Sequence, residues 1–226
     1  MVSKWCLGLA AAAMLAGCAS PPAPPAASDW HAVLLPGKRP TAYALAQKDG
    51  RAAVCAQADR SASLWRRKLL VPPDRLGDVS FSWWVPQPLV DASVADAERE
   101  DAVVRIVFAF GGDHAKLSMR NRVMFELAEA LTGEMPPYAT LMYVWDTRAA
   151  VGSIVVGSRT DRVRKIVVDA GDGGLRQWRD HRRDLVADFR RAFGEDPGPL
   201  QAIAVMTDTD NTGTKAEAWY GAITLH

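Results

Sequence analysis

The stretches Val103-Val-Arg-Ile-Val-Phe-Ala-Phe110 and Thr140-Leu-Met-Tyr-Val-Trp145 decide the fold of this chain. Both are short runs rich in apolar, β-branched and aromatic residues, and Gly, Pro or Asp lies close to their ends. Such runs are typical of buried β-strands, because a helix needs a longer segment with a period near 3.6 residues. They predict two strands of a β-sheet.

Runs of the same kind recur along the rest of the chain. Further candidate strands lie at residues 43–46, 52–57, 63–70, 79–85, 151–156, 162–168, 200–206 and 216–225. Many short strands at this spacing predict a mainly β protein, a β-sandwich or a jelly-roll-like fold. Two accessory helices are predicted, at Met119 to Leu131 and at Asp180 to Phe193, each closed by a nearby glycine. In the second, Phe189 lies on an apolar stripe that is expected to pack on the sheet.

The composition is that of an ordinary globular protein. The 226 residues are 49% hydrophobic and include 8 Trp, 6 Phe and 4 Tyr, which excludes a disordered chain. A net charge of +1 gives no reason to expect a nucleic-acid partner. No Pro/Gly/Ser linker and no repeat interrupts residues 30–226, so we expect a single domain there.

The amino-terminal residues predict export and a lipid anchor. Residues 1–17 contain Lys4 and then an apolar stretch that is too short to cross a bilayer, as in a signal peptide. The run Leu15-Ala-Gly-Cys18 resembles the bacterial lipobox, which implies cleavage before Cys18, acylation of that residue and a membrane partner. The alternative is a plain secretory signal cut near Ala19. Ala19 after the cysteine implies sorting to the outer membrane, facing the periplasm.

A tether follows the acylated residue. Residues 18–29 are rich in Pro and Ala and favour an extended polyproline conformation that holds the domain away from the lipid. After cleavage Cys55 is the remaining free thiol, so no disulfide within the chain is expected.

One loop has oxygen ligands at a spacing suited to calcium. Asp208, Asp210 and Thr212, followed by Gly213, match the first half of an Asp-x-Asp-x-Asp-Gly loop. The position that should hold a bidentate Glu is Trp219, which excludes an EF-hand. Two interpretations remain: a looser calcium site, or a turn whose side chains bond local backbone amides.

A second group of titratable residues lies in the predicted helix that begins at Asp180. Its carboxylates and His181 could perform acid and base chemistry if they lined a cleft. The alternative is a solvated face, because Asp180, Asp184 and Asp188 form a row at a spacing of four residues, interleaved with Arg. His31, His114 and His226 are scattered and show no metal-binding spacing.

Aromatic residues suggest a possible sugar-binding surface. In the pairs Trp83-Trp84, Tyr143 with Trp145, and Trp219-Tyr220, one residue is expected to fill the core and the other to face outward. An exposed aromatic ring can stack on the flat face of a pyranose. The alternative is that both sheets are covered and all these rings are buried.

The order of several segments resembles an exported bacterial family catalogued as domain of unknown function 3047. The resemblance covers nearly all of residues 30–226 and rests on Trp83, residues 101–108, 140–145, 162–168, 178, 183–189, 192–194, 205–212 and 219–221. The family implies no activity. Its pattern has an acidic residue where this chain has Ala222, which argues against an essential carboxylate at that position.

These observations favour a noncatalytic module that binds a glycan or another extended polar ligand. The candidate ligand-binding residues are Trp84, Asp101, Arg105, Tyr143, Trp145, Trp178, Arg183 and Asp184. One alternative is a hydrolase that uses Asp101, or Asp208 with Asp210, beside Arg105 or Arg183. Another is a scaffold that docks envelope proteins. Calcium is the one cofactor that the motifs suggest, and no nucleophile or nucleotide motif is present.

Overall fold

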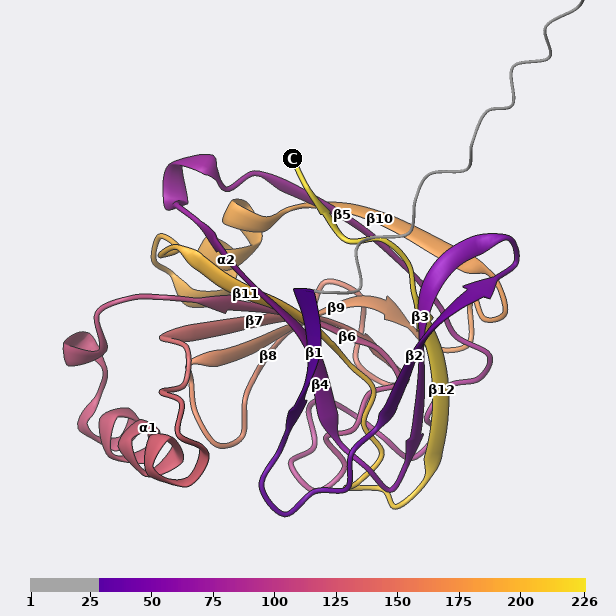
Figure 1. The fold of residues 1–226 in the computed structure, drawn as a ribbon, viewed down its shortest axis with the longest axis horizontal. Coiled ribbons are helices and arrows are strands. Elements are labelled where there is room, and N and C mark those ends of the chain that lie inside the picture. Colours follow the sequence, from indigo (N-terminus) through magenta and orange to yellow (C-terminus); the bar gives the residue numbers. More distant parts are fainter. Residues whose placement is uncertain (1–28) are drawn as a thin grey trace, which may run out of the picture.

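The structure is a computed structural model that describes residues 29–226 (Figure 1). The proposed signal peptide, Cys18 and all but the last residue of the tether lie outside the described residues. The strands are β1 (Trp30–Leu34), β2 (Ala42–Lys48), β3 (Arg51–Asp59), β4 (Ser63–Val71), β5 (Asp78–Trp84), β6 (Arg105–Phe110), β7 (Ala139–Asp146), β8 (Ile154–Val156), β9 (Val163–Ala170), β10 (Trp178–Asp184), β11 (Leu200–Met206), β12 (Lys215–Tyr220) and β13 (Thr224–Leu225). The α-helices are α1 (Met119–Thr132) and α2 (Leu185–Phe193), and two short 3₁₀ turns lie at Pro73–Arg75 and His114–Lys116.

The strands form two sheets that pack face to face. One has the order β1-β4-β11-β6-β7-β9-β8, and the other has the order β10-β5-β12-β3-β2, with β13 also paired to β5. Within both sheets the pairings are antiparallel, except that β7 and β9 run parallel. The prediction of a mainly β, sandwich-type fold is confirmed.

Large apolar side chains fill the space between the sheets. The seven-stranded sheet contributes Phe108 and Tyr143, and the six-stranded sheet contributes Phe81, Trp83 and Tyr220, all buried in one cluster. Phe81 and Tyr143 stack across the interface, with ring centroids 5.4 Å apart. Inward-facing and outward-facing side chains therefore alternate along the strands, because each inward side chain packs against apolar side chains of the opposite sheet.

The two helices are placed differently: α2 packs on the core and α1 lies at the edge of the domain. α1 begins at the cap Ser118 and ends at Gly133, whose positive φ of 74° suits a glycine, so the predicted helix over 119–131 is confirmed. It stands apart from both sheets, at the lower left of Figure 1. α2 packs against the core through Leu185 and Phe189, which are fully buried.

The predicted helix from Asp180 is wrong in its first part. Trp178–Asp184 is a strand that pairs along its full length with β5, and the helix begins only at Leu185. The Asp184 carboxylate accepts a hydrogen bond from the Ala187 backbone N–H and so caps the helix. The row of aspartates at helical spacing therefore does not exist.

Two further details differ from the prediction. β1 was not expected as a strand, and it pairs with β4 at the edge of the seven-stranded sheet. The long strand predicted over 216–225 is divided into β12 and β13 at Gly221, where a Cβ atom would lie 2.1 Å from the Ser82 hydroxyl. In the described residues no helix is long and apolar enough to cross a membrane.

Candidate functional site

The residues proposed from the sequence separate into three places. Asp101, Arg105 and Asp208 meet at one buried ion cluster. Tyr143 and Arg183 meet between the two sheets. The third place, the outer face of the six-stranded sheet, carries Trp84, Trp178 and Asp184, each in strand register with a residue of β5 or β10. Trp145 belongs to none of the three. It is buried, and its Nε1 donates a hydrogen bond to the Gly171 carbonyl.

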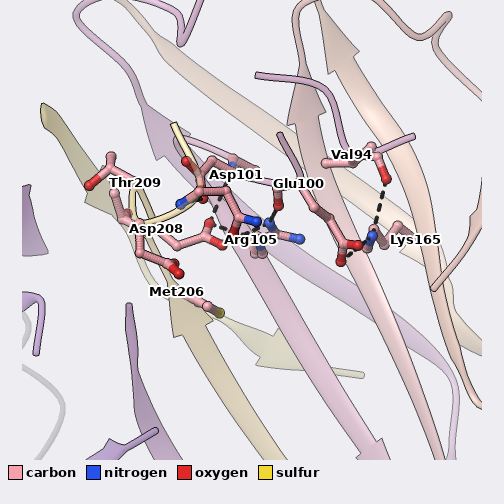
Figure 2. A network of polar contacts seen from close by, with 12 residues as sticks. Val94, Glu100, Asp101, Arg105, Lys165, Met206, Asp208 and Thr209 are labelled. Carbon is pink, nitrogen blue, oxygen red and sulfur yellow. Dashed lines mark hydrogen bonds and ion pairs between the residues drawn. The ribbon is translucent and has the colours of Figure 1, made fainter. Parts of the chain in front are cut away.

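The buried ion cluster is built around Arg105 at the start of β6 (Figure 2). Its Nε and Nη2 donate to the two carboxylate oxygens of Asp208 at 3.0 and 2.9 Å. It also donates to the Glu100 carbonyl. Burial is the largest influence on the pKa of Arg105 and lowers it, but the charge and hydrogen bonds of Asp208, together with the nearby acids, outweigh burial and raise that pKa. Burial also raises the pKa of the Asp208 carboxyl, against the opposing effect of Arg105.

A second cation extends this cluster. The Lys165 ammonium of β9 lies 2.6 Å from the Glu100 carboxylate and donates to the Val94 carbonyl (Figure 2). Burial lowers the pKa of Lys165, and the nearby positive charge of Arg105 lowers it further. The sequence analysis did not single out Lys165, because it stands beside Arg164 in the strand and no local pattern marks it as buried.

The proposed calcium loop is held in place by Asp101. This carboxylate accepts hydrogen bonds from the backbone N–H groups of Asn211 and Thr212 and from the Thr212 hydroxyl, at 2.6 to 3.2 Å. One oxygen each from Asp101, Asp208 and Asp210 lie within 4.8 Å of one another, a donor set that suits a hard cation. However, Asp208 is already paired with Arg105, and Asp210 with Lys38. These partners favour the turn interpretation, and calcium stays a prediction.

Two buried carboxylates, those of Asp188 and Asp169, form hydrogen bonds that link residues of the two sheets. Asp188 of α2 accepts from the Tyr143 hydroxyl at 2.8 Å and pairs with Arg183 through both carboxylate oxygens. Asp169 of β9 accepts from Trp83 Nε1 at 2.7 Å and also pairs with His181 and Arg179 of β10. Arg183 and Tyr143 are therefore held by Asp188 between the sheets, and neither lines the groove on the outer face of the six-stranded sheet.

The position of Asp169 leads to a prediction on pH. Burial acts to raise the pKa of its carboxyl, but hydrogen bonds from His181, Arg179 and Trp83 hold that pKa below the usual value. A lowered folded-state pKa stabilises the protein above the unfolded-state pKa, about 4, and this contribution disappears as the pH falls through the folded-state value. We expect the difference in unfolding free energy between the parent and Asp169→Asn to shrink on acidification below about pH 4. Urea unfolding at a series of pH values measures it, and a difference independent of pH would contradict the assignment.

The third place is a groove on the outer face of the six-stranded sheet. It has a volume of about 590 Å³ and is lined by Arg51, Ala52, Ser80, Phe81, Ser82, Asp180, His181, Arg182, Gly221, Ala222 and Thr224. The lining combines hydroxyls from β5 with charged side chains from β3 and β10. Arg51 pairs with Asp180 at 2.7 Å, and Arg182 pairs with Asp78 at 2.7 Å. The charged side chains of the groove are therefore paired, and its charge is close to balanced.

The β2–β3 turn closes one end of this groove. β2 and β10 lie at opposite edges of the six-stranded sheet, yet Trp178 Nε1 on β10 donates to the Lys48 carbonyl at 3.1 Å. Arg51 on the same turn lies over the Trp178 ring, 5.2 Å from its centroid. The turn at the end of β2 thus contacts the strand at the opposite edge of the sheet.

Three tryptophans of the outer face contact the residues that flank the turn. Trp178 is half-buried and lies beside the groove residue Gly221. Trp84 and Trp219 pack edge to face at 4.9 Å, and the Lys48 ammonium lies over both rings, 3.8 Å from the Trp84 centroid. Trp84 Nε1 is buried and has no hydrogen-bond partner among the described residues. The sequence analysis missed the groove residues Arg51, Ser80 and Ser82, since they come from strands that are distant in sequence.

A family model and several solved structures match the chain. The profile of a family described as "Protein of unknown function (DUF3047)" matches residues 28–224. No curated protein matches the sequence. Among solved structures, the xyloglucanase domain of NopAA from Sinorhizobium fredii, in complex with cellobiose, shares 8% identity, with 87% of this chain and 93% of that chain covered and a TM-score of 0.44.

Two further solved structures are similar. The family 11 carbohydrate-binding module of the cellulase Lic26A-Cel5E from Clostridium thermocellum shares 10% identity, covering 87% of this chain and 86% of that chain, with a TM-score of 0.40. A thermostable cellulase derived from Cel12A of Rhodothermus marinus shares 10% identity, covering 88% and 93%, with a TM-score of 0.47. These are similarities of overall fold.

Proposed function

Since the chain belongs to the family of unknown function DUF3047, whose description assigns no activity, we propose its function from its own surface. It is a noncatalytic module of the cell envelope that binds an extended, polar glycan in the groove of the six-stranded sheet. The observation that supports this most is the groove itself, where the half-buried Trp178 lies beside a lining of hydroxyls and paired charges.

The chemistry of the groove suits a sugar. A pyranose has a flat apolar face that can pack on an indole ring, and a rim of hydroxyls that need donors and acceptors. Ser80, Ser82 and Thr224 offer hydroxyls, while Arg51 and Asp180 offer charged partners for hydrogen bonds. The Trp84 N–H, which lacks a partner, is a further donor that a ligand could satisfy if the Lys48 side chain moved aside.

The positions of the carboxylates argue against the hydrolase alternative. Most glycoside hydrolases need two carboxylates that flank the scissile bond, about 5 to 9.5 Å apart. Among the described groove residues Asp180 is the one acid, and it is paired with Arg51. The acids proposed from the sequence lie elsewhere, and Asp101 and Asp208 are only 1% and 4% exposed. A substrate could not reach them in this conformation.

The binding proposal is tested by titrating the protein with oligosaccharides. Cellohexaose and chitohexaose serve as probes, and binding is followed by calorimetry. We expect Trp178→Ala to weaken binding at least about tenfold, equivalent to roughly 1.4 kcal/mol, because the indole beside the groove and its hydrogen bond to the β2–β3 turn are lost. Trp178→Phe should keep part of the affinity, since a ring remains. Leu45→Ala, an exposed change on the sheet edge, serves as the control.

Two results would overturn this proposal. One is the absence of binding to both oligosaccharides and to envelope glycan fragments. The other is an affinity that Trp178→Ala leaves unchanged.

The location of the module is part of the same proposal. We place the protein in the bacterial envelope, attached to the outer membrane through an acylated Cys18 and facing the periplasm. The lipobox-like run at residues 15–18 supports this. Labelling of the parent by radioactive palmitate, lost in Cys18→Ser, tests the attachment.

A further inference from the structure

α1 carries an apolar stripe that nothing in the described structure covers. Met119, Val123, Leu127 and Leu131 are 67%, 57%, 60% and 69% exposed. They recur every four residues, so they lie along one side of the helix over a length of about 18 Å. A run of exposed large apolar side chains marks an interaction surface.

The opposite side of α1 is the side that attaches to the domain. Phe125 is buried on it, with its ring 6.0 Å from that of His114. The Asn121 side-chain amide donates to Asp161 at 2.6 Å. The helix is therefore held in place, and its exposed stripe is a fixed feature of the surface.

We propose that the stripe on α1 rests in the lipid surface to which the chain is anchored. This rests on the proposed acylation of Cys18. The distance available between that residue and the domain supports it, because the segment from Cys18 to Asp29 can span at most about 40 Å at about 3.6 Å per residue. A domain on so short a tether meets the bilayer at an effective concentration in the millimolar range. Weak insertion by four apolar side chains then suffices.

The size of the stripe argues against a second copy of the chain as its partner. A stable protein interface buries about 800 Å² on each partner and involves some 20 to 30 residues. Four side chains on one helix fall well below that. The charges next to the stripe are mixed, with Arg120 and Arg122 near the start of α1 and Glu126 and Glu129 further along. The contact is therefore apolar, and we expect it to depend little on salt.

This contact leaves the groove free. Glu134, just beyond α1, pairs with Arg66 and Lys68 of β4, so the helix belongs to the side of the seven-stranded sheet. The groove lies on the six-stranded sheet, and in Figure 1 α1 and the β2–β3 hairpin stand on opposite sides of the molecule. A molecule docked through α1 points its groove away from the lipid.

The test uses the full acylated chain reconstituted in vesicles of phosphatidylethanolamine and phosphatidylglycerol. An environment-sensitive fluorophore is attached to Leu127→Cys, in a Cys55→Ser background, and brominated lipids are added as quenchers. We expect quenching at position 127 to be at least about twofold stronger than at the matched exposed position Leu45→Cys on β2. Adding Val123→Asp should abolish the difference, and raising the salt concentration should not.

The possible failures are distinct. A chain that does not float with the vesicles refutes the lipid anchor and, with it, the basis of this inference. A chain that floats but shows equal quenching at positions 127 and 45 overturns the docking of α1 alone. A shift from dimer to monomer on Val123→Asp in analytical ultracentrifugation, without any lipid quenching, would assign the stripe to a second copy instead.

Discussion

Asp208→Ala is expected to lower the unfolding free energy by about 3 to 5 kcal/mol. Asp208 is almost fully buried and forms two hydrogen bonds with the Arg105 guanidinium, which is itself only 3% exposed. Removing the carboxylate leaves a buried positive charge without its main partner, and the Ala102 backbone N–H also loses its acceptor. Urea unfolding followed by tryptophan fluorescence measures the effect.

Two variants control this prediction. Asp210→Ala removes a partly exposed acid whose ion-pair partner is Lys38, so the loss should stay within about 1 kcal/mol. The double variant Arg105→Met with Asp208→Leu removes both charges and should recover most of the stability lost in Asp208→Ala. If Asp208→Ala costs no more than Asp210→Ala, the cluster does not support the fold.

The same measurements decide the calcium interpretation. They are repeated by thermal unfolding in EDTA and in millimolar calcium. Because Arg105, Lys38 and the loop amides already bond the three carboxylates, we expect the same midpoint in both buffers. A midpoint that rises in calcium and that Asp210→Ala returns to its EDTA value would establish a site. At a calcium concentration 100 times the dissociation constant, binding would add about 2.7 kcal/mol.

Phe189→Ala is expected to cost about 3 to 5 kcal/mol, a large part of the 5 to 15 kcal/mol typical of a domain. The Phe189 side chain is fully buried, and its ring packs 4.6 Å from that of Phe110 and 4.5 Å from that of Phe193. Truncation leaves a cavity between α2 and the sheet, which the rigid strands cannot fill. The half-buried Val186 on the same helix provides the control, because Val186→Ala should cost much less. Equal losses would show that α2 does not pack through Phe189.

Strand β10 shows where a prediction of secondary structure from the local sequence pattern fails. The segment Trp178-Arg-Asp-His-Arg-Arg-Asp184 has no apolar alternation, and its charges at a spacing of four residues favour a helix by themselves. It becomes a strand because β5 offers a seven-residue antiparallel partner. Its inward-facing arginines can be partly buried because Asp169 of β9 and Asp188 of α2 form ion pairs with them. Asp188 lies five residues after Arg183 and Asp169 ten residues before Arg179, but β5 is about 100 residues away in the sequence.

The aromatic pairs show what alternation could and could not predict. Trp83 and Tyr220 are in the core while Trp84 and Trp219 face outward, as expected for neighbours on a strand. Tyr143 and Trp145, two residues apart, are both buried. Facing outward did not make Trp84 accessible, because Lys48 from the far edge of the sheet lies over its ring.

The sequence by itself determined the fold class, most of the strands, the end of α1 at Gly133, and the burial of Phe189. These depend on interactions within a few residues and on the apolar pattern of each segment, which can be followed along the chain. Only the tertiary structure decided which polar residues meet. Asp101 reaches the loop at residues 208–213, and the β2–β3 turn reaches β10, through contacts between segments more than 100 residues apart. Such contacts follow from the order and curvature of the sheets, and no local pattern of residues encodes either.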